Sequence, residues 1–136
     1  MNKLPATEFA ALVRTDFSSK ERWTELQRVA ANPPEPFIFS IVAIDDIAFE
    51  TRTVAELVAS LPEDYPHSSL FVADQRALGE DGLPCLVVDL LEEPGRTFRT
   101  LAREMASIEN NLSIANMGFE EFEAAAGPNG VFAGFE

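Results

Sequence analysis

The strongest constraint on the fold is an apolar run from Phe37 to Ile44, FIFSIVAI, whose only polar residue is Ser40. Prolines precede the run and Asp45 and Asp46 follow it directly, so the apolar segment ends abruptly on both sides. It is far shorter than the roughly 20 apolar residues that a membrane-spanning helix needs. A continuous apolar run of this length is typical of a strand covered on both faces. We therefore predict a central strand at residues 37–44.

Strand and helix patterns alternate around this run. Residues 10–15, AALVRT, form a strand pattern, after which Ser18 and Glu21 have the spacing of a capping box that opens a helix. The apolar face of that helix carries Trp23, Leu26 and Ala30. Thr53 and Glu56 repeat the capping-box spacing at the start of a second amphipathic helix. This order of strands and helices predicts parallel strands joined by helical crossovers.

The rest of the chain adds further strands and a helical C-terminal part. Strands are expected at 69–73, 85–91 and 97–101. Pro94 and Gly95 fit the centre of a type II turn that makes the last two strands an antiparallel hairpin. Residues 104–136 are mostly helical, with a restart at Asn116 and a short tail that docks on the core. We predict a single globular domain spanning residues 1–136, with an α/β fold, α+β remaining possible. Its single mixed sheet of about five strands follows the order βαβαβββ before the C-terminal helices.

Charge excludes several classes of partner. The chain carries 10 basic and 23 acidic residues, which gives a net charge of −13. Such a field repels phosphate backbones and anionic lipids, so we expect neither nucleic acid nor a membrane as a partner. The N-terminal segment lacks a signal-peptide pattern, and the one cysteine, Cys85, allows no intrachain disulfide. We therefore expect a cytoplasmic protein.

Acidic residues follow three of the predicted strands. Asp16, Asp45 with Asp46, and Asp74 stand at these strand ends. If the strands are parallel neighbours, the carboxylates open on the crevice where α/β sheets usually bind ligands, and together they could hold a magnesium ion. The alternative is that Asp16 and Asp46 cap helices or turns through their local backbone.

Two further charged residues lie inside strand patterns. Arg14 has apolar neighbours in the first strand, and Asp89 interrupts the apolar strand CLVVDLL. A buried aspartate needs a partner, and we predict a structural Arg14–Asp89 pair, with a perturbed carboxylate in a cleft as the functional alternative.

The inventory of reactive groups is thin. His67 is the only histidine and lies in a proline-flanked loop, and Cys85 begins a strand, where a buried and inert thiol is usual. Glycine-rich phosphate-binding patterns are absent, so we assign no cofactor, no metal and no established catalytic residue.

The C-terminal third carries acid without base, since no lysine or arginine follows Arg103. Within it, amides alternate with apolar residues in a helical segment that local propensity does not favour. The amides either cap helices and bond between them, or form a recognition surface. The candidate binding residues are Glu104, Glu109, Asn110, Asn111, Asn116, Glu120 and Glu121.

Four motifs carry a resemblance to a known family. They are LVRTDF at 12–17, LVVDL at 86–90, IENNLSIANM at 108–117 and FEEF at 119–122, and the likeness extends to VFAGF at 131–135. Together they resemble a family of small bacterial proteins of unknown function, over nearly the whole chain. The resemblance implies a bacterial source and a one-domain chain, and it transfers no catalytic or binding residue.

Three hypotheses of different classes follow. The first is a non-enzymatic acidic binding protein, of immunity or accessory type, that engages a basic protein partner through its acidic C-terminal third. The second is a magnesium-dependent enzyme that acts on a small phosphorylated substrate through the strand-end carboxylates. The third is a structural homo-oligomer that covers apolar surface supplied by the eleven phenylalanines. The sequence sets no oligomeric state.

Overall fold

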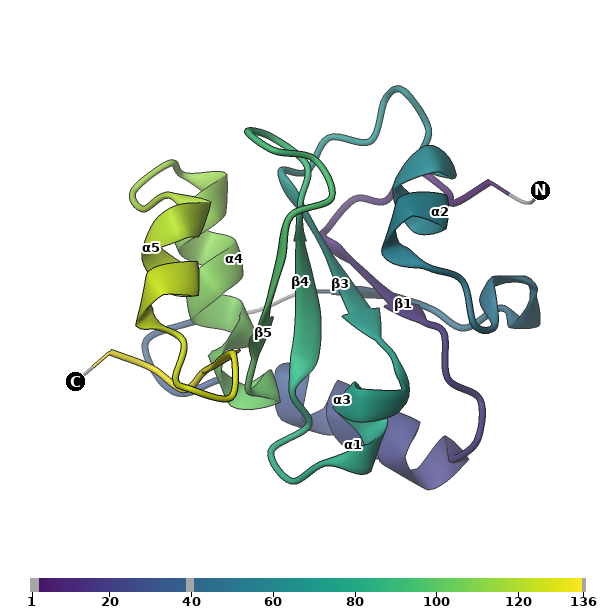
Figure 1. Ribbon diagram of the computed structural model, residues 1–136, viewed down its shortest axis with the longest axis horizontal. Helices are drawn as coiled ribbons and strands as arrows, with labels where there is room; N and C mark the ends of the chain where they lie inside the picture. Colours follow the sequence, from purple (N-terminus) through teal and green to yellow (C-terminus); the bar gives the residue numbers. More distant parts are fainter. Residues whose placement is uncertain (1–2, 39–40, 136) are drawn as a thin grey trace.

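The protein is built on a six-stranded mixed sheet in the computed structural model, which describes residues 3–38 and 41–135 (Figure 1). The strands are β1 (Ala11–Arg14), β2 (Val42–Ile44), β3 (Ser69–Ala73), β4 (Cys85–Asp89), β5 (Thr97–Thr100) and β6 (Val131–Phe132). Their order across the sheet is β2-β1-β3-β4-β5-β6. β1 pairs in parallel with both β2 and β3, β4 runs antiparallel to β3 and β5, and β6 is parallel to β5. The predicted α/β class with a mixed sheet is confirmed.

The predicted central strand is an edge strand instead. Only Val42–Ile44 of the apolar run pairs within the described residues, and it pairs with β1 alone. Residues 39 and 40, inside the predicted strand, lie outside the described residues. Phe37, Ile41 and Ala43 are partly buried against the core, whereas Ile38 is exposed. The apolar run therefore indicates that its side chains pack against the core, but it does not indicate how many strands lie beside it.

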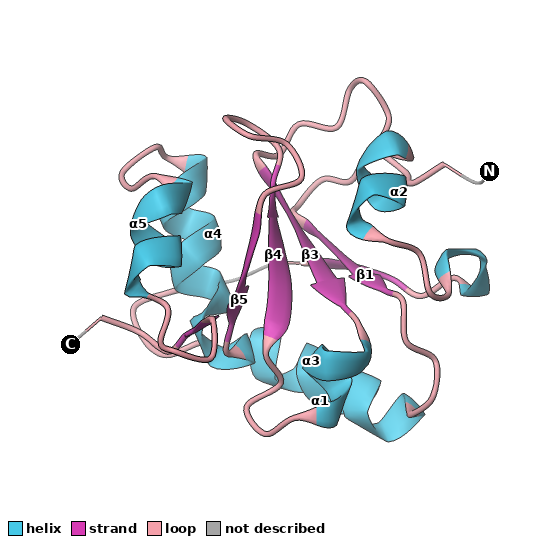
Figure 2. Ribbon diagram, in the orientation of Figure 1, coloured by secondary structure: helices cyan, strands magenta, loops and turns pink. Residues whose placement is uncertain are grey.

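Helices cover both faces of the sheet (Figure 2). They are α1 (Lys20–Ala30), η1 (Ile47–Phe49), α2 (Val54–Ala59), α3 (Gln75–Gly79), η2 (Ala102–Glu104), α4 (Met105–Ser113) and α5 (Phe119–Ala125), where η denotes a 3-10 turn. None of the helices among the described residues is long and apolar enough to cross a membrane.

Local sequence signals account for where the first two helices begin. Thr53 accepts a hydrogen bond from the Glu56 N–H at 3.2 Å, and Glu56 accepts one from the Thr53 N–H at 3.0 Å, so the predicted capping box of α2 is confirmed. The cap of α1 is one residue later than predicted. Ser19 caps it by accepting from the Arg22 N–H, because the Ser18 hydroxyl bonds to Asp16 instead.

Two apolar clusters hold the layers together. On one face, Leu12, Phe71 and Val87 pack against α1, α4 and α5. On the other face, Val13 and Val72 pack with α2 and η1. The alternation of side chains along each strand separates the clusters, as expected for strands buried on both sides.

The C-terminal tail adds a sixth strand where a docking segment was predicted. Phe132 in β6 joins Phe98, Phe119 and Phe122 in an aromatic group with ring centroids 4.8–6.2 Å apart. Many phenylalanines thus serve the core, which weakens the idea that they supply an oligomer surface. Phe135 extends the group while remaining 54% exposed.

Candidate functional site

The sheet has two ends at which loops and helix ends meet. At one end lie the carboxyl ends of the parallel strands β1, β2 and β3. At the other end lie the start of β3, the end of β4 and the turn from β4 to β5, beside the turn between α4 and α5 (Figure 1). Sequence-predicted residues fall at both ends, and each end contains a hollow.

The strand-end hollow has a volume of about 440 Å³. It is lined by Thr15, Asp16, Thr51, Arg52, Asp74 and Gln75. Parallel strands therefore bring Asp16 and Asp74 to one crevice, but each carboxylate already has local partners. Asp16 accepts from the Ser18 N–H and hydroxyl, and Asp46 caps η1 by accepting from the Ala48 N–H at 2.9 Å.

These carboxylates do not assemble a metal site among residues 3–38 and 41–135, where no group of three or more His, Cys, Asp or Glu side chains is placed to hold an ion. Asp45 pairs with Arg14 at 3.2 Å and is itself half exposed. The capping interpretation of the sequence therefore describes Asp16 and Asp46 better than the magnesium hypothesis does. Asp74, which the sequence suggested only as a magnesium ligand, also caps a helix, α3.

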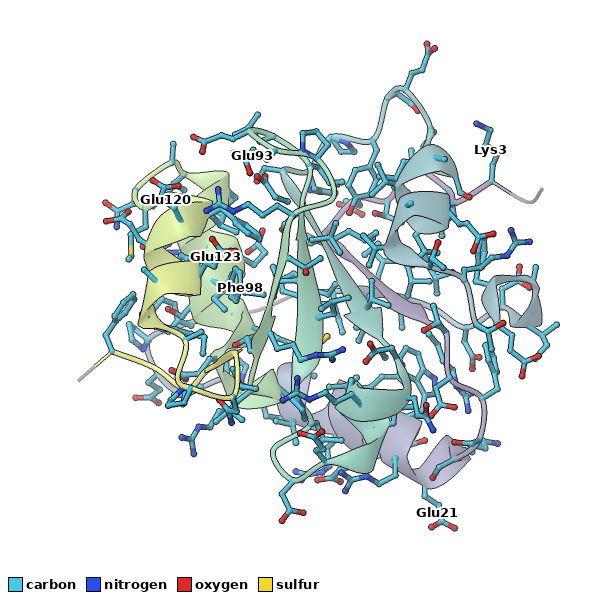
Figure 3. The ribbon with its side chains drawn as sticks, viewed as in Figure 1. Lys3, Glu21, Glu93, Phe98, Glu120 and Glu123 are labelled. Atoms are coloured by element: carbon cyan, nitrogen blue, oxygen red, sulfur yellow. The ribbon has the colours of Figure 1, made fainter. Side chains whose placement is uncertain are left out.

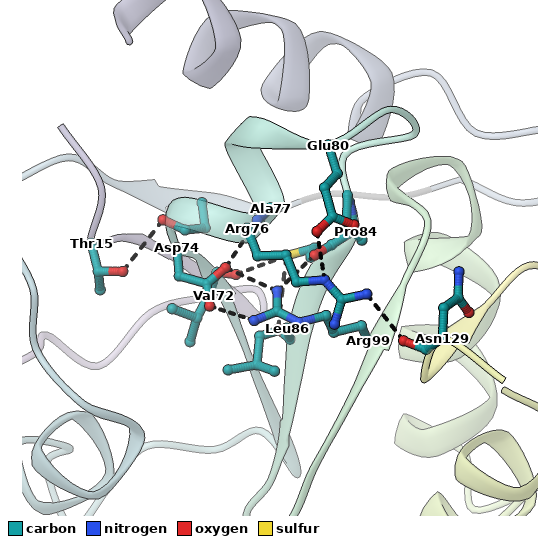
Figure 4. A network of polar contacts seen from close by, with 12 residues as sticks. Thr15, Val72, Asp74, Arg76, Ala77, Glu80, Pro84, Leu86, Arg99 and Asn129 are labelled. Atoms are coloured by element: carbon teal, nitrogen blue, oxygen red, sulfur yellow. Dashed lines mark hydrogen bonds and ion pairs between the residues drawn. The ribbon is translucent and has the colours of Figure 1, made fainter. Parts of the chain in front are cut away.

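Asp74 is the most engaged of the four (Figure 4). Its Oδ1 and Oδ2 accept from the Arg99 guanidinium at 2.9 and 2.6 Å, and Oδ1 also accepts from the Ala77 N–H at 3.0 Å, which caps α3. Arg99 donates in addition to the Pro84 carbonyl at 2.9 Å. Burial raises the pKa of Asp74, but the Arg99 and Ala77 hydrogen bonds outweigh it, so the pKa lies below its usual value.

Cys85 is a packing residue and not a nucleophile in this structure. Its thiol is fully buried and donates to the Val72 carbonyl at 3.3 Å. Burial, reinforced by the charge of Asp74, raises the pKa of the thiol far above its usual value, which keeps it protonated. His67 precedes the start of β3, at the opposite end of the sheet, so the two groups do not form a catalytic pair.

The predicted Arg14–Asp89 pair is wrong. Both residues are buried, at 6% and 3% exposure, but β4 is antiparallel to β3, so the ends of β1 and β4 lie at opposite ends of the sheet. Arg14 lies over the Phe17 ring at 4.3 Å and pairs with Asp45. Asp89 instead accepts backbone N–H bonds in the β4–β5 turn, from Leu91 at 2.9 Å, Glu92 at 3.4 Å and Glu93 at 2.9 Å.

The seven predicted C-terminal residues separate into groups. Asn111 lies in the last turn of α4 and Asn116 in the turn that follows it: the Asn111 amide donates to the Ser107 carbonyl at 2.8 Å, and the Asn116 amide donates to the Asn111 side chain at 2.7 Å. Glu120 is exposed on the first turn of α5 and Asn110 is exposed on α4. Glu104 stands at the start of α4, about 13 Å along the helix from its other end.

Three predicted residues, Glu109, Asn116 and Glu121, line hollows at the second end of the sheet. The larger, which we call the acidic hollow, has a volume of about 360 Å³. It is lined by Ser68, Asp89, Leu91, Glu92, Leu112, Ala115, Asn116, Met117, Gly118, Phe119 and Glu121. This set of described residues contains three acids and no base. Apolar side chains of the β4–β5 turn, of α4 and α5 and of the turn between them form most of the rest of its wall.

A smaller side hollow of about 200 Å³ adjoins it and shares Ser68, Leu91, Leu112 and Ala115. His67 and Glu109 line this second hollow. The His67 Nε2–H donates to the Thr7 carbonyl at 2.8 Å, because a carbonyl only accepts. Burial raises the pKa of Glu109, and the charge of His67 opposes that effect.

Sequence reasoning missed Ser68, Leu91 and Glu92. They reach the acidic hollow because the start of β3 pairs with the end of β4, with Ser69 opposite Asp89. The strand patterns at 69–73 and 85–91 were the available signal for this pairing. The short helix α3 between the two strands has no strong sequence pattern, so the sequence did not show how the strands are connected.

The chain can also be compared with known protein families. A domain of unknown function, DUF6924, matches residues 9–135, which is most of the chain. The chain belongs to the DUF6924 family. The resemblance to a family of unknown function is thereby confirmed, and the DUF6924 match includes both ends of the sheet and all four strand-end aspartates. No curated protein matches the chain.

Proposed function

We propose that this DUF6924 chain, folded as one domain, is a non-enzymatic acidic binding protein, of immunity or accessory type, in the cytoplasm of a bacterium. Its partner is a basic protein. The observation that carries the proposal is the acidic hollow, about 360 Å³ lined by three acids and no base among the described residues. A hollow of this size lies within the range of binding sites, roughly 300–1,000 Å³.

The surface around the hollow supports a cationic partner. Glu92, Glu93 and Glu120 are exposed there, and Figure 3 has Glu93, Glu120 and Glu123 on one side of the molecule, around α5 and the β4–β5 turn. Arg96 lies on this side, and it already pairs with Glu123 and, at 3.5 Å, with Glu93. Acid therefore remains in excess after this pairing, which favours association with basic surfaces.

The strand-end hollow supports the magnesium hypothesis less well. Its two acids, Asp16 and Asp74, are occupied by Ser18 and by Arg99, so a cation entering there would have to displace internal partners. The acidic hollow has no lysine or arginine among the described residues that line it, and its Asp89 and Glu121 carboxylates accept only backbone N–H bonds.

The test is binding to basic proteins encoded beside this gene, each purified and titrated calorimetrically. Two variants with equal charge change are compared, Glu92→Gln with Glu121→Gln on the proposed face, and Glu21→Gln with Glu50→Gln elsewhere. We expect one such protein to bind, with affinity that falls between about 0.05 and 0.3 M NaCl, as screening requires. The face variant should weaken binding at least about tenfold, the size of one lost charge-assisted contact, and the control should not. Binding that is indifferent to salt, or equal in both variants, contradicts the proposal.

A further inference from the structure

The acidic hollow contains a buried charge whose neutralising partner is missing from the described chain. Asp89 is 3% exposed and lines the hollow, yet none of the ion pairs among the described residues involves it. Its carboxylate is held by three backbone N–H groups of the turn. Those bonds stabilise the carboxylate, but they add no positive charge. A cation placed in the hollow would add a charge-to-charge attraction that these neutral N–H donors do not supply.

The acids that face the hollow come from three directions. Asp89 ends β4, Glu92 lies in the β4–β5 turn, and Glu121 lies on α5. The Glu121 Oε2 accepts from the Gly118 N–H at 2.8 Å, which fixes its carboxylate at the start of α5. Acceptors spread over several elements match a guanidinium, which carries five N–H donors in one plane, better than they match an ammonium.

Most of the other side chains that line the hollow are apolar. Leu112, Met117 and Phe119 line it, and Leu91 is 70% exposed at its edge although it is a large apolar side chain. Such walls suit the methylene stem and the flat faces of an arginine side chain, which pack on apolar and aromatic groups.

The protein itself shows how this side holds a guanidinium. Arg96 lies 5.6 Å over the Phe119 ring and pairs with Glu123 and Glu93. Arg96 does not line the hollow, and its charge is already matched by these two acids. A second guanidinium in the hollow would repeat the same arrangement, with Asp89, Glu92 and Glu121 as its acids.

We propose that the acidic hollow is the receptor for one arginine side chain of the basic partner protein, with the guanidinium among the three carboxylates and the stem along Leu91 and Met117. The inference rests on the proposed function, because it takes the partner to be a basic protein. It adds that a single inserted side chain, and not only a general attraction between charged surfaces, anchors the complex.

The probe is the blocked tripeptide acetyl-Gly-Arg-Gly-amide, titrated into the full-length ¹⁵N-labelled protein while amide shifts are followed. We expect saturable changes at the amides of Leu91, Glu92 and Met117 to Phe119. The matching citrulline peptide keeps the shape and lacks the charge, and it should bind at least about tenfold more weakly, as the loss of charge-assisted bonds implies. The lysine peptide should also bind more weakly than the arginine peptide.

Variants locate the site. Glu92→Gln and Glu121→Gln should each weaken the arginine peptide severalfold, and Gln at 121 can still accept the Gly118 bond, so the start of α5 is kept. Glu21→Gln, exposed on α1 at the far end of the molecule in Figure 3, is the matched control and should leave binding unchanged.

Equal binding of the citrulline peptide, saturable changes elsewhere, no saturable change at the hollow, or an equal loss in Glu21→Gln would each overturn the inference. The proposed function is judged separately. If a basic partner binds through the face while the arginine peptide does not bind in the hollow, only the inserted arginine is refuted, whereas loss of both refutes both.

Discussion

The Asp74–Arg99 pair should contribute more to stability than an ordinary surface ion pair. The two side chains are 29% and 14% exposed and are joined by two hydrogen bonds, so the pair lies between exposed pairs, worth about 0–1 kcal/mol, and buried ones, whose disruption costs about 3–5 kcal/mol. Asp74→Asn keeps a good helix cap for α3 and removes the charge. We expect it to lower the free energy of unfolding by about 2 kcal/mol.

Two companion variants divide this effect. Asp74→Ala also removes the cap of α3, which costs about 1 kcal/mol more, for a total of about 3 kcal/mol. Arg99→Met retains the apolar stem and removes the guanidinium, together with its bond to the Pro84 carbonyl. The double-mutant cycle of Asp74→Asn and Arg99→Met should give a coupling energy of about 2 kcal/mol at pH 7.

The effect should depend on pH in a defined direction. The folded-state pKa of Asp74 is depressed below its ordinary value of 3.8, so its contribution is fully present above that value. As the pH falls the unfolded chain takes up the proton first, and the contribution disappears once the folded carboxyl is protonated too. The cost of Asp74→Asn should therefore shrink toward zero in strong acid.

Urea unfolding followed by tryptophan fluorescence measures these energies. Trp23 is the only tryptophan and is 3% exposed, so it reports loss of the core. A loss of about 2 kcal/mol should also lower Tm by about 8 °C in a domain of this size. A coupling energy under about 0.5 kcal/mol at pH 7 would refute the reasoning, because that is the value of an exposed pair. So would a cost of Asp74→Asn that is the same in strong acid and at pH 7.

Three other substitutions test separate features by urea unfolding. Ala115→Gly should stabilise by about 1 kcal/mol, because Ala115 has φ +55° at the end of α4, and no gain would contradict strain there. Thr53→Ala should destabilise by about 1 kcal/mol through loss of the α2 cap, whereas Thr24→Ala, exposed on α1, should change stability by less than about 0.5 kcal/mol. Glu109→Gln should stabilise at pH 7, since burial raises the folded pKa of Glu109 and penalises its charged form. That gain should vanish well below pH 4.5, and a gain that persists there would exclude this cause.

Local sequence signals predicted the helices and turns themselves better than they predicted which elements lie beside one another. The capping box at Thr53 and Glu56 and the turn at Pro94 and Gly95 involve residues adjacent in the chain, and the structure has both, with Gly95 at φ +98° and the Arg96 N–H bonded to the Glu93 carbonyl at 2.9 Å. Such contacts depend little on the rest of the fold, so the sequence predicted these two, although it placed the cap of α1 one residue early.

The position of a strand in the sheet is a different kind of property. The run at 37–44 was predicted to be central, but β1 takes neighbours on both sides and β2 only one. Apolar side chains at an edge can be covered by helices and loops, so periodicity does not separate an edge strand from a central one. Short elements were also missed: α3 has five residues, and its cap, Asp74, was interpreted from the sequence only as a candidate ligand.

The candidate site shows the same division between local and distant contacts. The sequence marked the C-terminal acids, and Glu109, Asn116 and Glu121 do line hollows. The sequence-based prediction paired Asp89 with Arg14 because both are charged residues in apolar strands. That prediction took no account of the direction in which each strand runs. Once β4 is antiparallel to β3, Asp89 belongs to the far end of the sheet, and its neighbours become the β4–β5 turn and α5.

The observed partners of Arg14 and Asp89 also explain why the two ends of the sheet differ in what they can bind. At the strand ends, Arg14 pairs with Asp45 and Arg99 pairs with Asp74, so two of the four aspartates there have an arginine of the chain as partner. At the other end, Arg96 pairs with Glu93 and Glu123, outside the acidic hollow, and none of the ion pairs among the described residues involves Asp89. Carboxylates in a hollow that no basic side chain of the protein pairs with can form ion pairs with a cationic partner. A cationic group is therefore expected at the acidic hollow and not at the crevice where α/β sheets usually bind their ligands.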